Sequence, residues 1–150
     1  MSDLILKVIP TDPNFTPSKA LAGAAKSLLA SMVPDADDVR SLVRDAVGFI
    51  DPGSNLESIS CPQCRKAIDQ DWWSDAMDRA SKSQFSELAV DLPCCGQPST
   101  LNDLTYDWPV GFARFSLEAR NPGVKELTPD QIQGMQEALG TPVRVIWARL

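Results

Sequence analysis

The chain contains four cysteines whose spacing could place four sulfurs around one metal ion. Cys61 and Cys64 form a C-P-x-C turn, and Cys94 and Cys95 lie in a P-C-C-G turn further along the chain. A C-P-x-C turn directs two thiolates to one side of a tight loop, which is the geometry that a tetrahedral ion needs. Four thiolates around one ion leave no coordination position open for a substrate. We therefore predict a structural zinc centre with these four cysteines as ligands.

Other uses of the four sulfurs stay open at this point. The cysteines could be free buried thiols, a disulfide, or a C-x-x-C redox pair. A redox pair is favoured at a helix N-terminus, where the pKa of its first cysteine falls. The nearest helix signal begins only near Asp69, well beyond Cys64. The position of that helix argues against redox use.

The C-x2-C turn and the gap of 29 residues before Cys94 resemble a zinc ribbon, in which two sulfur-bearing turns face each other. The chain departs from that family because Cys94 and Cys95 are adjacent, whereas ribbons usually carry C-x2-C in both halves. Adjacent side chains point apart in a strand, so both can bind one ion only if the turn bends sharply, and Gly96 favours such a bend. The resemblance implies a zinc-stabilised lobe. We place it at residues 60–99, as an insert within a single domain that spans residues 1–150.

Hydrophobic periodicity predicts the elements on either side of this insert. Strands are expected near 4–9, 111–119 and 143–148, and helices near 17–32 and 129–139. The first helix has Thr16 as its expected N-cap. The segment 39–51 fits a helix or a strand. We predict a strand there, because β-branched and aromatic residues gather at its end.

The two ends of the chain share one pattern of elements. Each has a strand, a turn with proline, a Thr-Pro pair and a helix before the chain continues. Two such halves give the order β-α-β-β-α-β, which resembles a ferredoxin-like split βαβ sandwich. We therefore predict an α+β fold, with both helices on one face of an antiparallel sheet and a zinc-ribbon-like lobe inserted between the halves.

The composition excludes several kinds of active site. The sequence has no histidine, so Ser-His-Asp, Cys-His and H-E-x-x-H arrangements are impossible. It also lacks a P-loop, a G-x-G-x-x-G and a G-x-S-x-G motif. The carboxylates at 69–78 recur at the spacing of a solvated helix face, and nothing pairs them as acid and base. We predict that the protein is not an enzyme.

Charge and aromatic residues indicate the class of partner. The net charge of −6 favours a protein partner and argues against nucleic acid, which usually meets a cationic surface. Tyr106 and Trp108 lie in the loop after the insert and are the candidate partner-binding residues. We predict a non-catalytic, zinc-stabilised protein-binding module. The alternatives are a nucleic-acid-binding zinc-ribbon protein, which arginines on the closing strands would serve, and a toxin-neutralising immunity protein.

The N-terminal residues lack the basic and long apolar regions of a signal peptide. The most apolar stretch, 20–33, is too short and too polar to span a bilayer. We therefore expect a cytoplasmic protein without a membrane partner. In that compartment thiols stay reduced, and clustered cysteines bind metal more often than they form disulfides.

Overall fold

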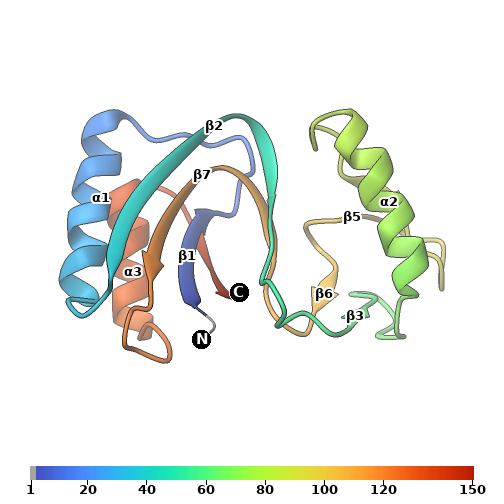
Figure 1. Ribbon diagram of the computed structural model, residues 1–150. Coiled ribbons are helices and arrows are strands. Elements are labelled where there is room, and N and C mark those ends of the chain that lie inside the picture. The colour runs from blue at the N-terminus through green and yellow to red at the C-terminus, as the bar shows by residue number, and fades with distance from the viewer. Residues whose placement is uncertain (1–2) are drawn as a thin grey trace.

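Two β-α-β units, one from each end of the chain, build the larger part of the protein (Figure 1). The computed structural model describes residues 3–150. The larger part, the sandwich, consists of β1 (Leu4–Pro10), α1 (Lys19–Met32), β2 (Asp38–Ile50), β7 (Gly111–Arg120), α3 (Pro129–Leu139) and β8 (Val143–Arg149). The smaller part, the lobe, consists of β3 (Ile59–Ser60), α2 (Gln70–Lys82), β4 (Ala89–Asp91), β5 (Pro98–Thr100) and β6 (Thr105–Tyr106). The ambiguous segment 39–51 is thus strand β2, as predicted.

The sandwich contains one sheet with the strand order β2-β7-β1-β8, and all neighbouring strands are antiparallel. The two strands of each β-α-β unit are separated by a strand of the other unit. β7 lies between β1 and β2, and β1 lies between β7 and β8. This interleaving is the split βαβ arrangement. The α+β, ferredoxin-like prediction is therefore confirmed.

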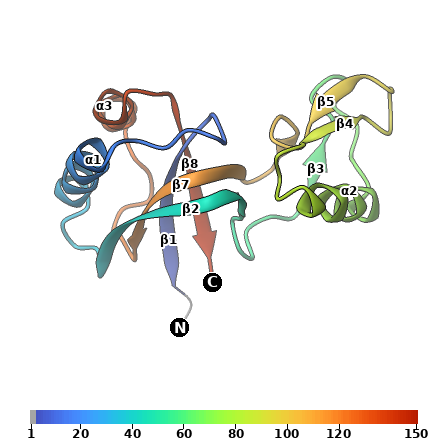
Figure 2. The same cartoon turned by 90° about the horizontal axis from the view of Figure 1, so that it is seen from above.

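Both helices of the sandwich cover the same face of the sheet and lie side by side (Figure 2). Their apolar residues pack on alternate residues of the central strands, such as Leu6 of β1 and Phe115 of β7. α1 begins two residues later than predicted, because the side chain of Ser18, and not that of Thr16, accepts a hydrogen bond from the Leu21 amide at 3.2 Å. Within residues 3–150, none of the helices combines the length and apolarity needed to cross a membrane.

The chain after β2 joins the two edges of the sheet at one end. β2 changes register between Val43 and Gly48 and bends strongly (Figure 1). The chain then reaches the outer edge of β8. There the backbone amide of Arg149 donates to the Pro52 carbonyl at 3.1 Å, and the Arg149 carbonyl accepts from the Ser54 amide at 2.9 Å. A small apolar cluster in the sandwich is formed by Ile9, Ile50, Ala113 and Ile146, one from each strand of the sheet.

The lobe has an apolar core of its own, which continues onto the ends of two sandwich strands. α2 contributes one face to this core, with Trp72, Trp73, Ala76, Met77 and Ala80 at helical spacing. Val47 of β2 and Phe112 of β7 belong to the same cluster. β3 pairs with β6, so strand pairing within the lobe reaches from Ile59 to Tyr106. The lobe is therefore seated on the sheet and does not hang from it by a free linker.

Candidate metal centre

Two turns of the lobe bring the four cysteine sulfurs together. All four Sγ atoms lie within 4.8 Å of one another. The Sγ atoms of Cys61 and Cys95 are 3.9 Å apart, and those of Cys64 and Cys94 are 3.1 Å apart. Sulfurs bound tetrahedrally at the zinc–sulfur distance would lie about 3.8 Å apart. The cluster could therefore hold a metal ion, with one ligand atom from each cysteine.

Backbone hydrogen bonds build the first turn around Cys61. The Arg65 amide donates to the Cys61 carbonyl at 3.0 Å, and the Cys61 amide donates to the Lys66 carbonyl at 2.9 Å. Arg65 has the left-handed φ of 65° that closes such a turn. The amides of Gln63 and Cys64 point at the Cys61 Sγ, at 3.3 and 3.4 Å. These donors favour the thiolate form of Cys61.

The second turn bends at Gly96, as predicted from its sequence. The Gly96 amide donates to the Leu92 carbonyl at 2.8 Å, and φ of Gly96 is 72°. This left-handed conformation costs glycine little, since it has no Cβ. The bend brings both Cys94 and Cys95 to the cluster despite their adjacency.

The four sulfurs differ in their surroundings. Cys61 is buried, Cys94 is half-buried, and Cys64 and Cys95 are exposed. Burial raises the pKa of the Cys61 thiol, but the amides of Cys64 and Gln63 outweigh it and lower that pKa to about 6. The hydrogen bond with Cys64, together with burial, raises the pKa of Cys94 to about 12. An ion entering the cluster would therefore meet a thiolate at Cys61 and displace a proton from Cys94.

The structure places the two predicted partner-binding residues in different surroundings. Tyr106 is half-buried in the lobe core, where its hydroxyl donates to the Leu101 carbonyl and accepts from Nε1 of Trp73. Trp108 is 42% exposed. Of the two, Trp108 therefore presents more of its ring to a partner, and partner binding at either residue stays a prediction.

A groove in the lobe was missed by sequence reasoning. It lies between α2 and the β4–β5 hairpin and has a volume of about 610 Å³. Small side chains leave part of this space, namely Ala76 and Ala80 of α2 and Ala89 and Ser99 of the hairpin, and Trp72, Arg79 and Glu87 also line it. Small residues on separate elements form no motif, so only the folded structure reveals the space they leave.

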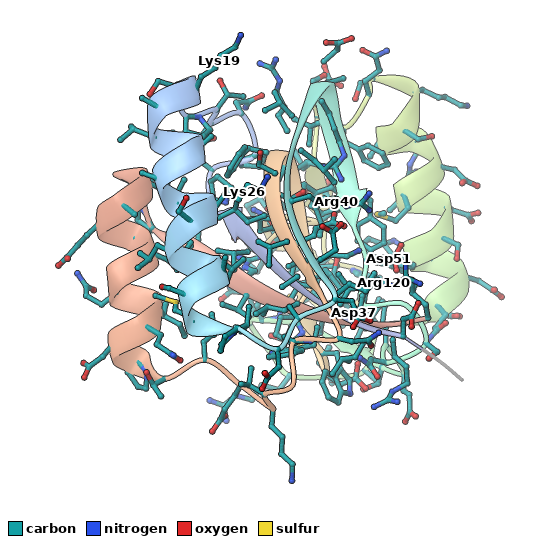
Figure 3. The ribbon with its side chains drawn as sticks, turned by 60° about the vertical axis from the view of Figure 1, so that its left-hand side comes forward. Lys19, Lys26, Asp37, Arg40, Asp51 and Arg120 are labelled. Atoms are coloured by element: carbon teal, nitrogen blue, oxygen red, sulfur yellow. The ribbon has the colours of Figure 1, made fainter. Side chains whose placement is uncertain are left out.

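Most arginines of the open sheet face are occupied by neighbouring groups. Arg40 pairs with the buried Glu118 at 3.3 Å, and Arg114 donates to the Arg44 carbonyl at 3.1 Å. Arg120 is ion-paired with Asp3 and also lies beside Asp37, whose amide donates to the Arg120 carbonyl (Figure 3). A further arginine, Arg144, donates to the carbonyl oxygens of Val110 and Asn102. The face is therefore a network of internal pairs, not a row of free cations.

Comparison with known proteins identifies no relative. No protein-family model, no curated protein and no solved structure matches this chain.

Proposed function

We propose that the lobe holds a structural zinc ion and that the protein is a non-catalytic protein-binding module. The single observation that carries the proposal is the meeting of four cysteine sulfurs within 4.8 Å. A site with four sulfur ligands favours zinc, which takes four such ligands tetrahedrally in structural sites. Four protein ligands fill the coordination shell, so the ion's role is to fold the lobe and not to activate a substrate.

The small size of the lobe supports a structural role for the ion. Its strands contain two or three residues each and form two-stranded sheets. Sheets this short are marginal in water without additional support. Small units with little core commonly depend on a metal, whose binding energy becomes folding energy.

The distribution of charge supports a basic protein partner. Residues 51–110 contain ten acidic residues (Asp and Glu) and four basic ones (Lys and Arg). The rest of the chain contains ten acidic and ten basic residues. The whole net charge of −6 therefore belongs to this segment. Asp71, Asp75 and Asp78 are exposed along α2, and the ion pairs found in residues 3–150 all lie in the sandwich. The lobe thus offers unpaired carboxylates that would attract a cationic surface.

Nucleic-acid binding is the alternative, and the arginines of the open sheet face are its basis. Arg40 and Arg120 are paired with carboxylates, and some N–H groups of Arg114 and Arg144 are occupied by backbone carbonyls, so fewer donors are available to phosphate. The acidic lobe would also repel a polyanion. These two features make a protein partner the better-supported choice.

The zinc half of the proposal is tested by metal analysis. Protein purified under reducing conditions should contain about one zinc per chain, since four ligands complete one site. Protein without bound metal that also fails to take up added Zn²⁺ would reject this half.

The partner half is tested by affinity capture from the native host with matched charge variants. Asp75→Asn with Asp78→Asn removes two carboxylates from the lobe, and Glu126→Gln with Glu137→Gln removes two exposed carboxylates from the sandwich. We expect the first pair to weaken capture and the second to leave it unchanged. Equal effects would reject the lobe as the interface. Salt-sensitive retention on an RNA or DNA column would instead support the alternative.

A further inference from the structure

The two cysteine turns are copies of one structural unit, offset by 31 residues. In the first, the amide of Cys61 donates to the carbonyl of Lys66 at 2.9 Å. In the second, the amide of Leu92 donates to the carbonyl of Gln97 at 2.9 Å. Leu92 therefore begins the second turn as Cys61 begins the first.

Other backbone features follow the same offset. The Arg65 amide donates to the Cys61 carbonyl, and the Gly96 amide donates to the Leu92 carbonyl. Arg65 and Gly96 also share the left-handed conformation, with φ of 65° and 72°. The strand contacts that flank the turns, Ser60–Ala67 and Asp91–Pro98, correspond as well.

This correspondence places the cysteines at unequal positions of the repeated turn. Cys61 and Cys64 occupy its first and fourth positions. Cys95 also occupies the fourth position, but Leu92 stands at the first and Cys94 at the third. The sulfurs of Cys61, Cys64 and Cys95 therefore come from the first and fourth positions of the turn. The sulfur of Cys94 comes from the third position, which carries no cysteine in the first turn.

We infer that the second turn lacks its regular first ligand at Leu92, and that Cys94 supplies the fourth sulfur from a less suitable position and is the first ligand to leave the ion. This inference rests on the proposed metal site. It identifies Cys94 as the point where the site opens.

The distances between the sulfurs support the inference independently of the backbone. The 3.9 Å between the Sγ atoms of Cys61 and Cys95 is close to the about 3.8 Å of a tetrahedral zinc site. The 3.1 Å between those of Cys64 and Cys94 is too short, so these two sulfurs must separate when an ion binds. The misfit joins Cys94 to Cys64, and of these two sulfurs only that of Cys94 comes from the irregular third position of its turn.

The surroundings of Leu92 explain how the substitution is accommodated. Leu92 is 2% exposed and packs in the lobe core, as the fully buried Cys61 does. Because the backbones of the two turns correspond, the Cβ of Leu92 should point toward the cluster as that of Cys61 does. A cysteine at residue 92 would then present its sulfur to the ion.

The test moves the fourth sulfur back to the regular position in the full-length protein. Zn²⁺ affinity is measured by competition with a chelator, and Co²⁺ absorption reports the number of sulfur ligands. We expect Cys94→Ala to weaken Zn²⁺ binding about 10-fold or more, the scale on which perturbed zinc sites lose affinity. Leu92→Cys combined with Cys94→Ala should restore both the affinity and the four-sulfur Co²⁺ spectrum.

Two control variants make the rescue specific. Leu92→Ala with Cys94→Ala also removes most of the leucine side chain but adds no sulfur, and it should not regain affinity. Leu92→Cys with Cys95→Ala should not regain affinity either. Its new sulfur lies at the first position of the turn and cannot replace the missing sulfur at the fourth. Failure of rescue at Cys94, or equal rescue of Cys94→Ala and Cys95→Ala, would overturn the inference. So would a Cys94→Ala variant that binds Zn²⁺ as tightly as the wild type.

A second measurement needs no variant and therefore does not depend on variant folding. The Zn²⁺-loaded wild type is treated with iodoacetamide while a chelator withdraws the ion, and the alkylated cysteines are identified by mass spectrometry. We expect Cys94 to react first, whereas exposure alone favours Cys64 and Cys95. First reaction at either of those two would overturn the inference but leave the zinc proposal standing. A wild type that binds no Zn²⁺ would overturn both.

Discussion

The indole nitrogen of Trp73 donates a hydrogen bond to the hydroxyl of Tyr106 at 3.1 Å, and that hydroxyl donates to the carbonyl of Leu101 at 2.6 Å. The chain of bonds links α2, β6 and the segment that follows β5. The two rings also meet edge to face, with centroids 6.3 Å apart. Tyr106 therefore helps to fix the position of the helix on the rest of the lobe.

Titration of Tyr106 tests this arrangement directly, because the chain contains a single tyrosine. Burial raises the pKa of its hydroxyl to about 12, despite the opposing hydrogen bond from Trp73. Since the neutral form is favoured in the folded state, stability should be unaffected below about pH 10 and fall as the pH rises toward 12. Phenolate absorbance should give a midpoint near 12 in folded protein and about 10 in denaturant. A folded-state midpoint near 10 would mean that the hydroxyl faces water.

Replacement of Trp108 by alanine tests its role at the surface. Its ring is 42% exposed, so we expect the melting temperature to change little. If Trp108 is an interface hot spot, the free energy of partner binding should become less favourable by more than about 1 kcal/mol. A matched loss of both stability and capture would instead assign the ring to the lobe core. Tyr106→Phe is the contrasting variant, because it leaves two polar groups unpaired and should destabilise the protein by about 1–3 kcal/mol.

Replacement of Cys61 by serine tests whether the metal site folds the lobe. If the lobe depends on a bound metal, removal of the buried Cys61 thiol should raise hydrogen exchange between Ile59 and Tyr106 and spare β1, α1, α3 and β8. A chelator added to the wild type should produce the same pattern. Uniform loss of protection across the sandwich would contradict a separate metal-dependent lobe.

The affinity for Zn²⁺ should rise with pH near neutrality. Cys94, whose pKa is raised to about 12, stays protonated in the metal-free protein and must release its proton to bind an ion. This group alone should raise the affinity about tenfold per pH unit. Cys61, with its pKa lowered to about 6, adds to the slope only at lower pH. Competition titrations between about pH 7 and 8.5 should show this slope, and Cys94→Ala should reduce it by about one unit. A flat profile would argue against proton displacement.

Replacement of Gly53 by alanine tests the closure between β2 and β8. Gly53 has a φ of 64°, and an added Cβ would overlap the Arg149 backbone. We expect the free energy of unfolding to fall by about 2 kcal/mol or more. Gly140→Ala is the control, since Gly140 has a φ of 73° but open space around its Cα. Equal losses for the two variants would show that the contact with Arg149 adds nothing.

Local patterns explain which features could be predicted from the sequence. The Thr128–Gln131 capping box and Gly140 mark both ends of α3, because these signals depend on neighbouring residues only. The C-P-x-C turn is equally local. The docking of residues 52–54 on β8 and the groove beside α2 depend on contacts between distant segments, so no local pattern indicates them.

The adjacent pair Cys94 and Cys95 is an intermediate case. Its sequence indicates metal binding but does not reveal that Leu92 aligns with Cys61. That alignment follows from backbone hydrogen bonds, Cys61 to Lys66 and Leu92 to Gln97. The paired residues differ in side chain, so the sequence shows no repeat. Tyr106 is similar, since its loop position indicates a surface aromatic, whereas the hydroxyl lies between Trp73 and Leu101.

The register of β2 on β7 has an architectural consequence. Ile50 is paired with Gly111, so the chain leaves the sheet and returns to it at directly opposed positions. Without the sixty residues between them, these strands would need only a short hairpin turn to remain connected. The lobe is thus an insertion in the hairpin connection between β2 and β7. It could be exchanged for another domain without changing the strand order of the sheet. Such a truncated protein would also lose the docking of residues 52–54 on β8. It would require polar replacements at Val47, Phe49 and Phe112, because these side chains pack against the lobe core.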